Sequence, residues 1–274
     1  MIIYLMVVFL IIIILYLIAI MPRILHRPDI SPFRERYYAH RGLHNNLSGV
    51  PENSLKAFES AVQGGYGIEL DVQLSKDKIP VVFHDYTLKR VCGVNKKVNE
   101  LTYQELEKLR LFSTGERIPL LQEALEVIDG RVPLIVELKI PYRPKDTCEK
   151  TDKILKKYKG VYCIESFNPL GLVWYKKKHP EVIRGQLSTD YFKDKEKGNR
   201  LKFFILQNLL LNFLTKPDFI AYHYIHWNNV SFRICTEIYK AHAFAWTIRS
   251  QKALEKSRKH FKFFIFDSFT PKKE

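Results

Sequence analysis

Eight short apolar runs with β-strand character recur along the chain, separated by stretches that have the residue spacing of amphipathic helices. The predicted strands span 37–40, 66–72, 133–139, 161–166, 182–187, 218–223, 243–248 and 263–267. The predicted helices span 53–63, 102–109, 119–128, 147–158, 169–178, 201–214, 229–241 and 250–259. Helical crossovers connect parallel strands, so this alternation predicts a (β/α)8 TIM barrel of the α/β class, with its active site at the carboxyl ends of the strands.

One additional apolar run, ProValValPheHis at 80–84, does not belong to this series. Only a few residues around SerLysAspLys separate it from the preceding strand. That connection is too short for a parallel crossover and suits a hairpin. We therefore expect the run to return antiparallel over the barrel rim and to bring His84 back toward the site.

The first 21 residues carry no charged side chain, and Ile2–Ile20 is long enough to cross a bilayer as a helix. A basic leading region and a small-residue cleavage site are not evident, so we expect an uncleaved anchor rather than a signal peptide. The alternative is a buried helix of a soluble protein. Lys and Arg follow the span but do not precede it, which favours a cytoplasmic catalytic domain.

Three regions are therefore predicted along the chain. Residues 1–21 form a transmembrane anchor in the lipid bilayer of the cell membrane. Residues 22–36, with three prolines among basic residues, form a juxtamembrane linker that lies on anionic headgroups. Residues 37–274 form the catalytic barrel.

Composition narrows the classes of partner. The net charge of +15 suits an anionic substrate, an anionic membrane surface or nucleic acid. No nucleic-acid-binding module and no Arg-rich arm is evident, so we expect no nucleic-acid partner. The four cysteines are far apart and form no CxxC motif, which argues against a zinc-cysteine site and leaves disulfides open.

Charged residues recur at alternate positions in two of the predicted strands, as Glu69-x-Asp71 and Glu137-x-Lys139. Strand geometry turns both members of each pair to the same face. A single inward Glu is most simply a structural ion pair with Lys139. Three carboxylates with two histidines, His40 and His84, instead indicate a site for a metal or a charged ligand, because unpaired buried charge is costly.

The residue types indicate the chemistry of phosphodiester cleavage. Glu69, Asp71 and Glu137 offer hard oxygen ligands, which favour Mg²⁺ or Ca²⁺ as the divalent cation. His40 and His84 are the candidate general acid and general base, because imidazole titrates near neutral pH. The sequence does not assign the two roles.

Several longer motifs occur in a fixed order: AlaHisArgGly, ProGluAsnSer, IleGluLeuAspVal, ValValPheHisAsp, LeuThrTyrGlnGluLeu, IleProLeuLeuGlnGluAlaLeu and ValGluLeuLys. From about residue 38 to 140 the chain resembles the glycerophosphodiester phosphodiesterase family. GluSerPheAsn, AlaTrpThrIle and PheAspSerPheThrPro resemble the later strand ends of that family more loosely. The resemblance implies a (β/α)8 barrel, the same three metal ligands, and hydrolysis of a glycerophosphodiester substrate to glycerol 3-phosphate and an alcohol.

Two cations and three further residues are candidates for substrate contacts. Arg41 and Lys139 would bind the phosphate, as the family pattern also indicates. Glu52 and Asn53 either contact the active site or cap the helix that follows, with equal weight. The resemblance places Trp246 against the glycerol or alcohol part of the substrate, while the simpler alternative is barrel core.

Other polar residues near strand ends have simpler interpretations. Asp85 either orients His84 or begins a turn. His223, His226 and Trp227 either line the pocket or belong to an exposed loop, and the loop is the commoner case. A last pair, Asp267 and Ser268, is predicted to lie on the rim without a catalytic role.

Segment 201–214 is apolar on nearly every face. We expect a well-buried barrel helix, with a membrane-docking segment or an apolar lid as the alternative. With the anchor, this segment supports an alternative function as a lysophospholipase D, with a lysophospholipid substrate, or as a polyglycerolphosphate hydrolase at the membrane. A third hypothesis is an inactive scaffold or lipid-binding barrel, and the intact set of candidate catalytic residues argues against it.

Overall fold

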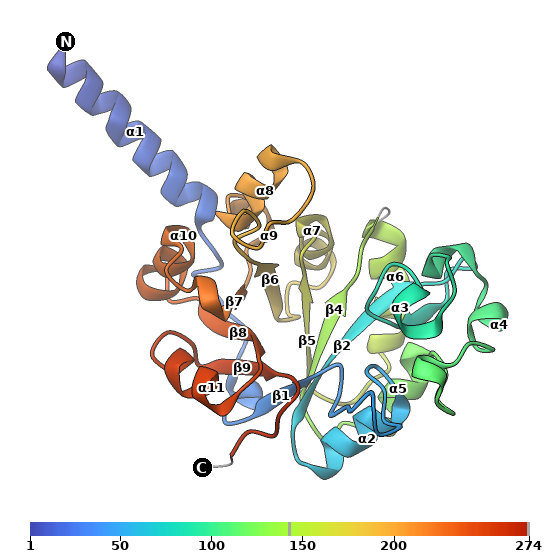
Figure 1. Ribbon diagram of the computed structural model, residues 1–274. Coiled ribbons are helices and arrows are strands. Elements are labelled where there is room, and N and C mark those ends of the chain that lie inside the picture. Colours follow the sequence, from blue (N-terminus) through green and yellow to red (C-terminus); the bar gives the residue numbers. More distant parts are fainter. Residues whose placement is uncertain (142–143, 273–274) are drawn as a thin grey trace.

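The computed structural model describes residues 1–141 and 144–272, and within them eight parallel strands close into a barrel surrounded by helices (Figure 1). Each strand pairs with its neighbours in chain order, and β1 pairs with both β2 and β9 to close the barrel. The predicted TIM barrel is confirmed. The barrel strands are β1 (Tyr37–His40), β2 (Gly67–Leu74), β4 (Leu134–Leu138), β5 (Tyr162–Ser166), β6 (Arg184–Ser188), β7 (Phe219–His223), β8 (His242–Ile248) and β9 (Phe263–Phe266).

The helices follow the predicted alternation, with several differences at their ends. Their bounds are α1 (Ile2–Ile20), α2 (Leu55–Gln63), α3 (Lys89–Cys92), α4 (Tyr103–Leu106), α5 (Leu121–Ile128), α6 (Pro144–Leu155), α7 (Pro169–Lys178), α8 (Arg200–Gln207), α9 (Asn212–Thr215), α10 (Val230–Arg233) and α11 (Gln251–Ser257). The single helix predicted at 201–214 is wrong. It is interrupted at Leu209, whose φ of 56° lies in the left-handed region that a helix cannot include.

The hairpin prediction is confirmed. Strand β3 (Pro80–Val82) pairs antiparallel with β2, with Val82 opposite Val72, and places His84 beside the barrel rim. The excursion that follows, which contains α3 and α4, lies beside the barrel and has an apolar core of its own (Figure 1). That core consists of Val81, Phe83, Leu88, Val91, Val98, Leu101, Leu106, Leu111 and Ile118.

Apolar side chains fill the lower part of the barrel interior, and polar side chains occupy the carboxyl ends of the strands. Tyr38, Phe219 and Phe244 belong to the inner apolar cluster. Two glycines make room for these large rings: a Cβ on Gly67 would come within 2.5 Å of the Tyr38 ring, and one on Gly185 within 2.0 Å of the Phe219 ring. This apolar packing lies beneath the polar side chains at the carboxyl ends of the strands and supports them.

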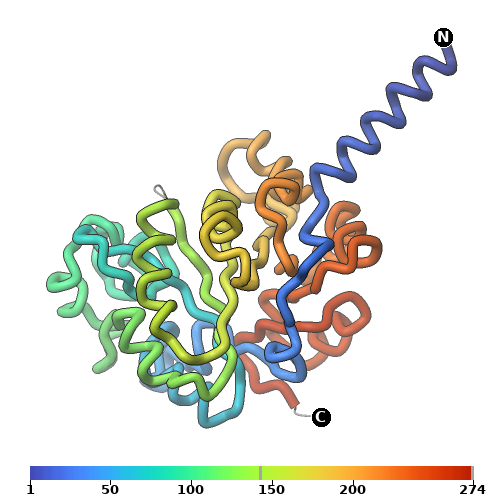
Figure 2. The backbone as a smooth tube through the Cα atoms, turned by 180° about the vertical axis from the view of Figure 1, so that it is seen from behind, coloured from blue at the N-terminus to red at the C-terminus, as the bar shows by residue number. Residues whose placement is uncertain are grey.

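Helix α1 projects away from the barrel, and it is the one helix in the described part of the chain that is long and apolar enough to cross a membrane (Figures 1 and 2). Such a helix is compatible with an anchor or with a signal sequence. Only its last turn packs on the barrel: Ile20 is fully buried, the Tyr16 hydroxyl hydrogen-bonds to Ser231, and Tyr239 donates to the Leu17 carbonyl.

The segment after α1 runs along the outside of the barrel to β1 (Figure 2). Arg23 pairs with Asp218 at 3.4 Å, Arg27 donates to the carbonyl of Tyr239, and Phe33 joins the inner apolar cluster. Two of the basic residues predicted to meet headgroups therefore contact the barrel. The boundaries 1–21, 22–36 and 37–274 stay predictions, and residues 142–143 and 273–274 of the last region lie outside the described residues.

All four cysteines lie in the described part of the chain and are free, so this structure contains no disulfide among them. Cys92 is half-buried and the other three are buried, which agrees with a role in packing.

Candidate active site

The three predicted metal ligands meet at the carboxyl ends of β2 and β4. Carboxylate oxygens of Glu69, Asp71 and Glu137 lie within 4.8 Å of one another, and all three side chains are buried. Asp71 and Glu137 face each other in the strand register, while Leu70 points into the outer core. The same-face arrangement predicted from alternate positions is present.

Electrostatics make this cluster a suitable site for a divalent cation. Burial raises the pKa of Glu69 well above its ordinary value, and the negative charges of Asp71 and Glu137 raise it further. Lys139 offsets part of the repulsion, with Nζ 2.8 Å from Glu137 and 3.2 Å from Asp71. Asp71 Oδ1, the oxygen that the Lys139 ammonium approaches, is buried and accepts no hydrogen bond. Three buried carboxylates with one lysine between them fit hard-cation ligation, and their oxygens suit Mg²⁺ or Ca²⁺.

The HisArgGly turn wraps over this cluster. The Arg41 backbone N–H donates to Glu69 at 3.0 Å, and Arg41 itself has a φ of 57°, which only a strongly supported turn imposes on a non-glycine residue. Gly42 has a φ of 79°, and a Cβ there would come within 2.8 Å of the Ala57 backbone. The glycine of the motif is therefore required by the close approach of α2.

Both candidate catalytic histidines have a carboxylate at Nδ1. His84 Nδ1 lies 2.7 Å from Asp85, and His40 Nδ1 lies 3.4 Å from Asp267. His40 Nε2 points toward the carboxylates, 4.0 Å from Glu69. The orienting role predicted as one option for Asp85 fits this geometry, whereas Asp267 was expected only to lie on the rim.

Burial dominates the environment of His40. It lowers the pKa of His40 to about 4, the charge of Arg41 lowers it too, and Asp267 opposes both. The surroundings of His40 therefore favour the neutral form of its imidazole.

The structure shows which groups cap α2 and which groups Glu52 and Asn53 contact. Ser54, and not Asn53, caps α2, because its hydroxyl accepts a hydrogen bond from the Ala57 N–H at 3.2 Å. Asn53 Nδ2 donates to Asp71 at 2.9 Å, and Glu52 accepts from Arg41 at 2.6 Å. Both residues contact members of the site, and the helix-cap interpretation of Asn53 is wrong.

Arg90 joins the two sides of the site and was missed in the sequence. Its guanidinium donates to both carboxylate oxygens of Glu52, at 2.8 and 2.7 Å, and to Asp85 at 2.7 Å. Glu52 in turn holds Arg41, and Asp85 holds His84. No periodic pattern marks Arg90, which lies in the short helix α3 of the excursion, so only the fold reveals this connection.

Two further features border the carboxylates. Glu165 on β5 faces Glu137 in the register, is fully enclosed, and has a pKa raised well above its ordinary value by burial and by Glu137. Trp246 on β8 stacks on His223 with ring centroids 5.2 Å apart and meets Phe167 edge-on at 5.4 Å. Trp246 is thus part of an aromatic wall at the strand ends, and its contact with substrate stays a prediction.

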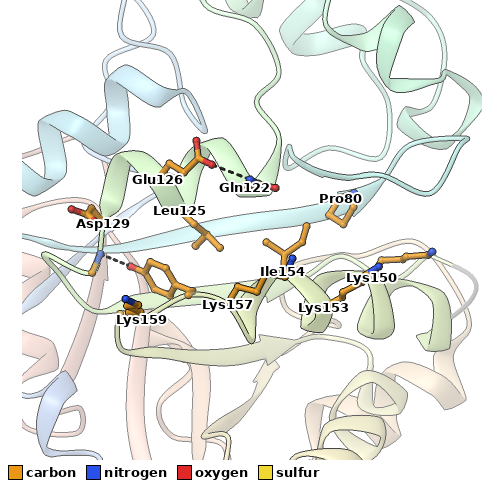
Figure 3. A pocket seen from close by; sticks show the side chains of 13 residues that line it. Pro80, Gln122, Leu125, Glu126, Asp129, Lys150, Lys153, Ile154, Lys157 and Lys159 are labelled. Atoms are coloured by element: carbon orange, nitrogen blue, oxygen red, sulfur yellow. Dashed lines mark hydrogen bonds between the residues drawn. The ribbon is translucent and has the colours of Figure 1, made fainter.

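The protein has two surface pockets, one far from the candidate site residues and one beside His40. One of about 650 Å³ lies outside the barrel between α5 and α6, lined by lysines such as Lys153 and Lys157 over Leu125 and Ile154 (Figure 3). It contains none of the predicted site residues. Another, of about 570 Å³, is lined by segments 42–46 and 266–270, which include Asp267, and therefore adjoins His40.

Comparison with known proteins identifies close relatives of this sequence. A profile described as the Glycerophosphoryl diester phosphodiesterase family matches residues 40–256. A glycerophosphodiester phosphodiesterase of Caldanaerobacter subterraneus subsp. tengcongensis is 40% identical over 162 residues, 54% of this chain and 65% of that protein. A lysophospholipase D of Rattus norvegicus is 34% identical over 152 residues, 50% of this chain and 46% of that protein. The matches thus span about half to two thirds of these relatives.

Solved structures show the same architecture over more of the chain. An Oleispira antarctica phosphodiesterase in complex with the product sn-glycerol-3-phosphate has a TM-score of 0.68 and 26% identity, covering 86% of this chain and 94% of that one. A glycerophosphodiester phosphodiesterase from Parabacteroides distasonis has a TM-score of 0.67 and 24% identity, covering 85% and 93%. The similarity to the Parabacteroides distasonis structure is evidence for the fold alone.

Proposed function

The chain belongs to the glycerophosphoryl diester phosphodiesterase family, and from that premise we propose that it hydrolyses glycerophosphodiesters to glycerol 3-phosphate and an alcohol in a reaction that depends on a divalent cation. One observation carries the proposal: three buried carboxylates lie beside two imidazoles, each of which has an aspartate at Nδ1. A carboxylate cluster that can hold a cation, with a proton donor and a proton acceptor beside it, is a set of groups suited to metal-assisted cleavage of a phosphate diester.

The charged residues would divide the work of binding. Glu69, Asp71 and Glu137 would hold Mg²⁺ or Ca²⁺, which when bound neutralises charge on the phosphate. Arg41 and Lys139 would bind the phosphate oxygens, the guanidinium as a planar fork and the ammonium as a point charge. Both cations already lie within 4 Å of Asp71, so a phosphate near this carboxylate comes within their reach.

The histidines would move the protons. Burial lowers the pKa of His40 and favours its neutral form, so it suits the general base that accepts a proton from the attacking water. If a glycerol hydroxyl attacks first instead, a cyclic phosphate forms, and a water activated by the same base then opens it to glycerol 3-phosphate. His84 would then donate a proton to the leaving alkoxide. In this arrangement Asp267 and Asp85 keep each Nδ1 protonated, which leaves Nε2 free for the reaction.

The test uses detergent-solubilised full-length protein with glycerophosphocholine, glycerophosphoethanolamine and glycerophosphoglycerol. Release of glycerol 3-phosphate is measured with Mg²⁺, with Ca²⁺ and with chelator. His40→Ala serves as the inactive variant, and His26→Ala, in the exposed segment after α1, serves as the matched histidine control. Metal-dependent release by the wild type and by His26→Ala is expected. Absence of release by folded wild-type protein, with every metal and diester, would contradict the proposal.

A second candidate function, lysophospholipase D activity, is favoured by the surface next to α1. Segment 201–214 is predicted to be a well-buried helix, but Leu201 and Phe204 on α8 are 69% and 50% exposed, and Phe213 on α9 is 40% exposed. Helix α9 contacts α1. A bilayer that holds α1 would lie close to these side chains, and the relative from Rattus norvegicus is a lysophospholipase D.

The same assay separates the two candidates when lysophosphatidylcholine is included. Release of lysophosphatidic acid without turnover of the soluble diesters would assign the second activity. We further propose that α1 is an uncleaved membrane anchor and that the barrel lies on the cytoplasmic side. Protease treatment of intact cells tests the orientation, because a cytoplasmic barrel is protected until the cells are opened.

A further inference from the structure

We propose that Asp194, His223 and His226 form a second cation site, separate from the carboxylate cluster and suited to a transition metal such as Zn²⁺. One ligand atom from each residue lies within 4.8 Å of the other two. His226 Nε2 is 2.7 Å from Asp194 Oδ1, and His223 Nδ1 is 3.5 Å from Asp194 Oδ2. Three ligands that leave a position open are characteristic of zinc sites in which water or another group completes the coordination.

The chemistry of the donors distinguishes this cluster from the first. Two imidazole nitrogens and one carboxylate suit borderline metals, whereas an all-carboxylate set suits Mg²⁺ or Ca²⁺. His223 Nδ1 is buried and has no hydrogen-bond partner. Its nearest acceptor, Asp194 Oδ2 at 3.5 Å, is too far for a strong hydrogen bond, and a cation between the two groups would satisfy both.

Neighbouring contacts hold the ligands in place. The Thr189 hydroxyl donates to Asp194, and the His223 ring stacks on Trp246 at a centroid distance of 5.2 Å. Hydrogen bonds and packing of this kind orient ligands in metal sites. The His226 and His223 rings meet at 80° with centroids 5.2 Å apart.

The position of the cluster indicates what an ion would do. Asp194 lies between β6 and α8, His223 ends β7, and His226 lies in the short 3-10 helix Tyr224–His226. A bound ion would tie two loops of the barrel rim together. Because one ligand stacks on Trp246, the ion would also fix the aromatic wall beside the carboxylate site.

Zinc binding to metal-free full-length protein in detergent tests the proposal. Zn²⁺ is titrated calorimetrically with Mg²⁺ in excess, so that the carboxylate cluster is already supplied. His223→Phe keeps a ring against Trp246 but removes the nitrogen, and Asp194→Asn keeps the shape but removes the charge. His26→Ala is the matched control. We expect the wild type and the control to bind one Zn²⁺, and both cluster variants to lose at least about tenfold in affinity.

Two results would overturn the proposal. Equal Zn²⁺ affinity in the wild type, His223→Phe and Asp194→Asn would show that these residues do not bind the ion. Asp194 would then serve only as a hydrogen-bond acceptor that holds the loops together. Loss of zinc binding in Glu69→Gln, with binding retained in the cluster variants, would assign the ion to the carboxylates. Should the variants fail to fold, the visible spectrum of Co²⁺ in the wild type decides, because a spectrum typical of six oxygen ligands excludes imidazole ligation.

Discussion

Each candidate catalytic imidazole is paired with an aspartate. Substitution of the histidine removes the proton-transfer group, whereas substitution of the aspartate removes only the group that orients it. For His84 the partner is Asp85, at 2.7 Å. We expect His84→Gln to lower kcat about 10²–10⁴-fold, because the proton donor is lost. Asp85→Asn retains the imidazole but not its acceptor, so we expect a smaller loss and a shifted pH profile.

Glycerol 3-phosphate release measured across pH checks both variants. Glu255→Gln on the exposed face of α11 is the control for a change of charge alone, and it should match the wild type. An Asp85→Asn enzyme with wild-type kcat and pH profile would show that the hydrogen bond does not orient the imidazole.

Glu52 makes a specific contribution to the pH dependence of stability. Burial would raise its pKa, but Arg90 and Arg41 lower it from 4.5 to about 2. A carboxyl whose pKa is lowered in the folded state stabilises the protein above its unfolded value, and this stabilisation is lost as pH falls through the window from 4.5 to about 2. The difference corresponds to about 3 kcal/mol.

Urea unfolding at a series of pH values tests this expectation. We expect Glu52→Gln to be less stable than the wild type at neutral pH, because it removes the buried negative charge that pairs with both guanidinium groups. The difference should shrink as the pH falls below 4.5. A constant difference across the acid range would mean that the Glu52 charge is not what stabilises the turn.

The candidate site residues that the sequence suggests share a local signal. Glu69 and Asp71 occupy alternate positions of β2, Glu137 on β4 lies two residues before Lys139, and His40 belongs to a short motif. Arg90 became recognisable only in the fold, because Glu52, which it joins to the nearby Asp85, lies 38 residues away along the chain. Long-range ion pairs carry no periodicity, so sequence reasoning has no means of finding them.

At the scale of the element, strands were placed more accurately than helices. Each predicted strand coincides with an observed one to within about two residues, because buried parallel strands are continuous apolar runs bounded by polar loops. Helix 201–214 was predicted as one unit, since hydrophobicity carries no information about the positive φ of Leu209 that interrupts it. Its apolar residues are shared between the barrel core and an exposed surface.

The beginning of α2 yields an element-scale prediction. Ser54 is fully buried, and its side chain caps the helix. We expect Ser54→Ala to lower the free energy of unfolding by about 1 kcal/mol, because one backbone N–H loses its acceptor. Urea denaturation measures the change, and Ser48→Ala in the loop before α2 is the matched control. Equal effects from the two substitutions would argue against the cap.

At the scale of the whole molecule, α1 consists of two parts with different surroundings. Residues 2–15 are exposed, whereas Tyr16, Leu17 and Ile20 contact the barrel. The proposed anchoring role of this helix and its packing against the barrel are therefore separable by a deletion that ends before Tyr16. A longer deletion would remove the fully buried Ile20 and cost about 2 kcal/mol or more of barrel stability.

Deletion of residues 2–15 is expected to move the protein from the membrane pellet to the soluble fraction, while its unfolding midpoint stays unchanged. Turnover of soluble glycerophosphodiesters should persist, because the carboxylate cluster and both histidines lie on the barrel strands and their loops. Turnover of a bilayer-embedded lysophospholipid, if the enzyme has that activity, should fall because the site is no longer held at the surface. If the truncated protein remains in the pellet, the exposed apolar side chains of α8, and not residues 2–15, attach it to the membrane. In that case Phe204→Ser combined with the deletion should release the protein.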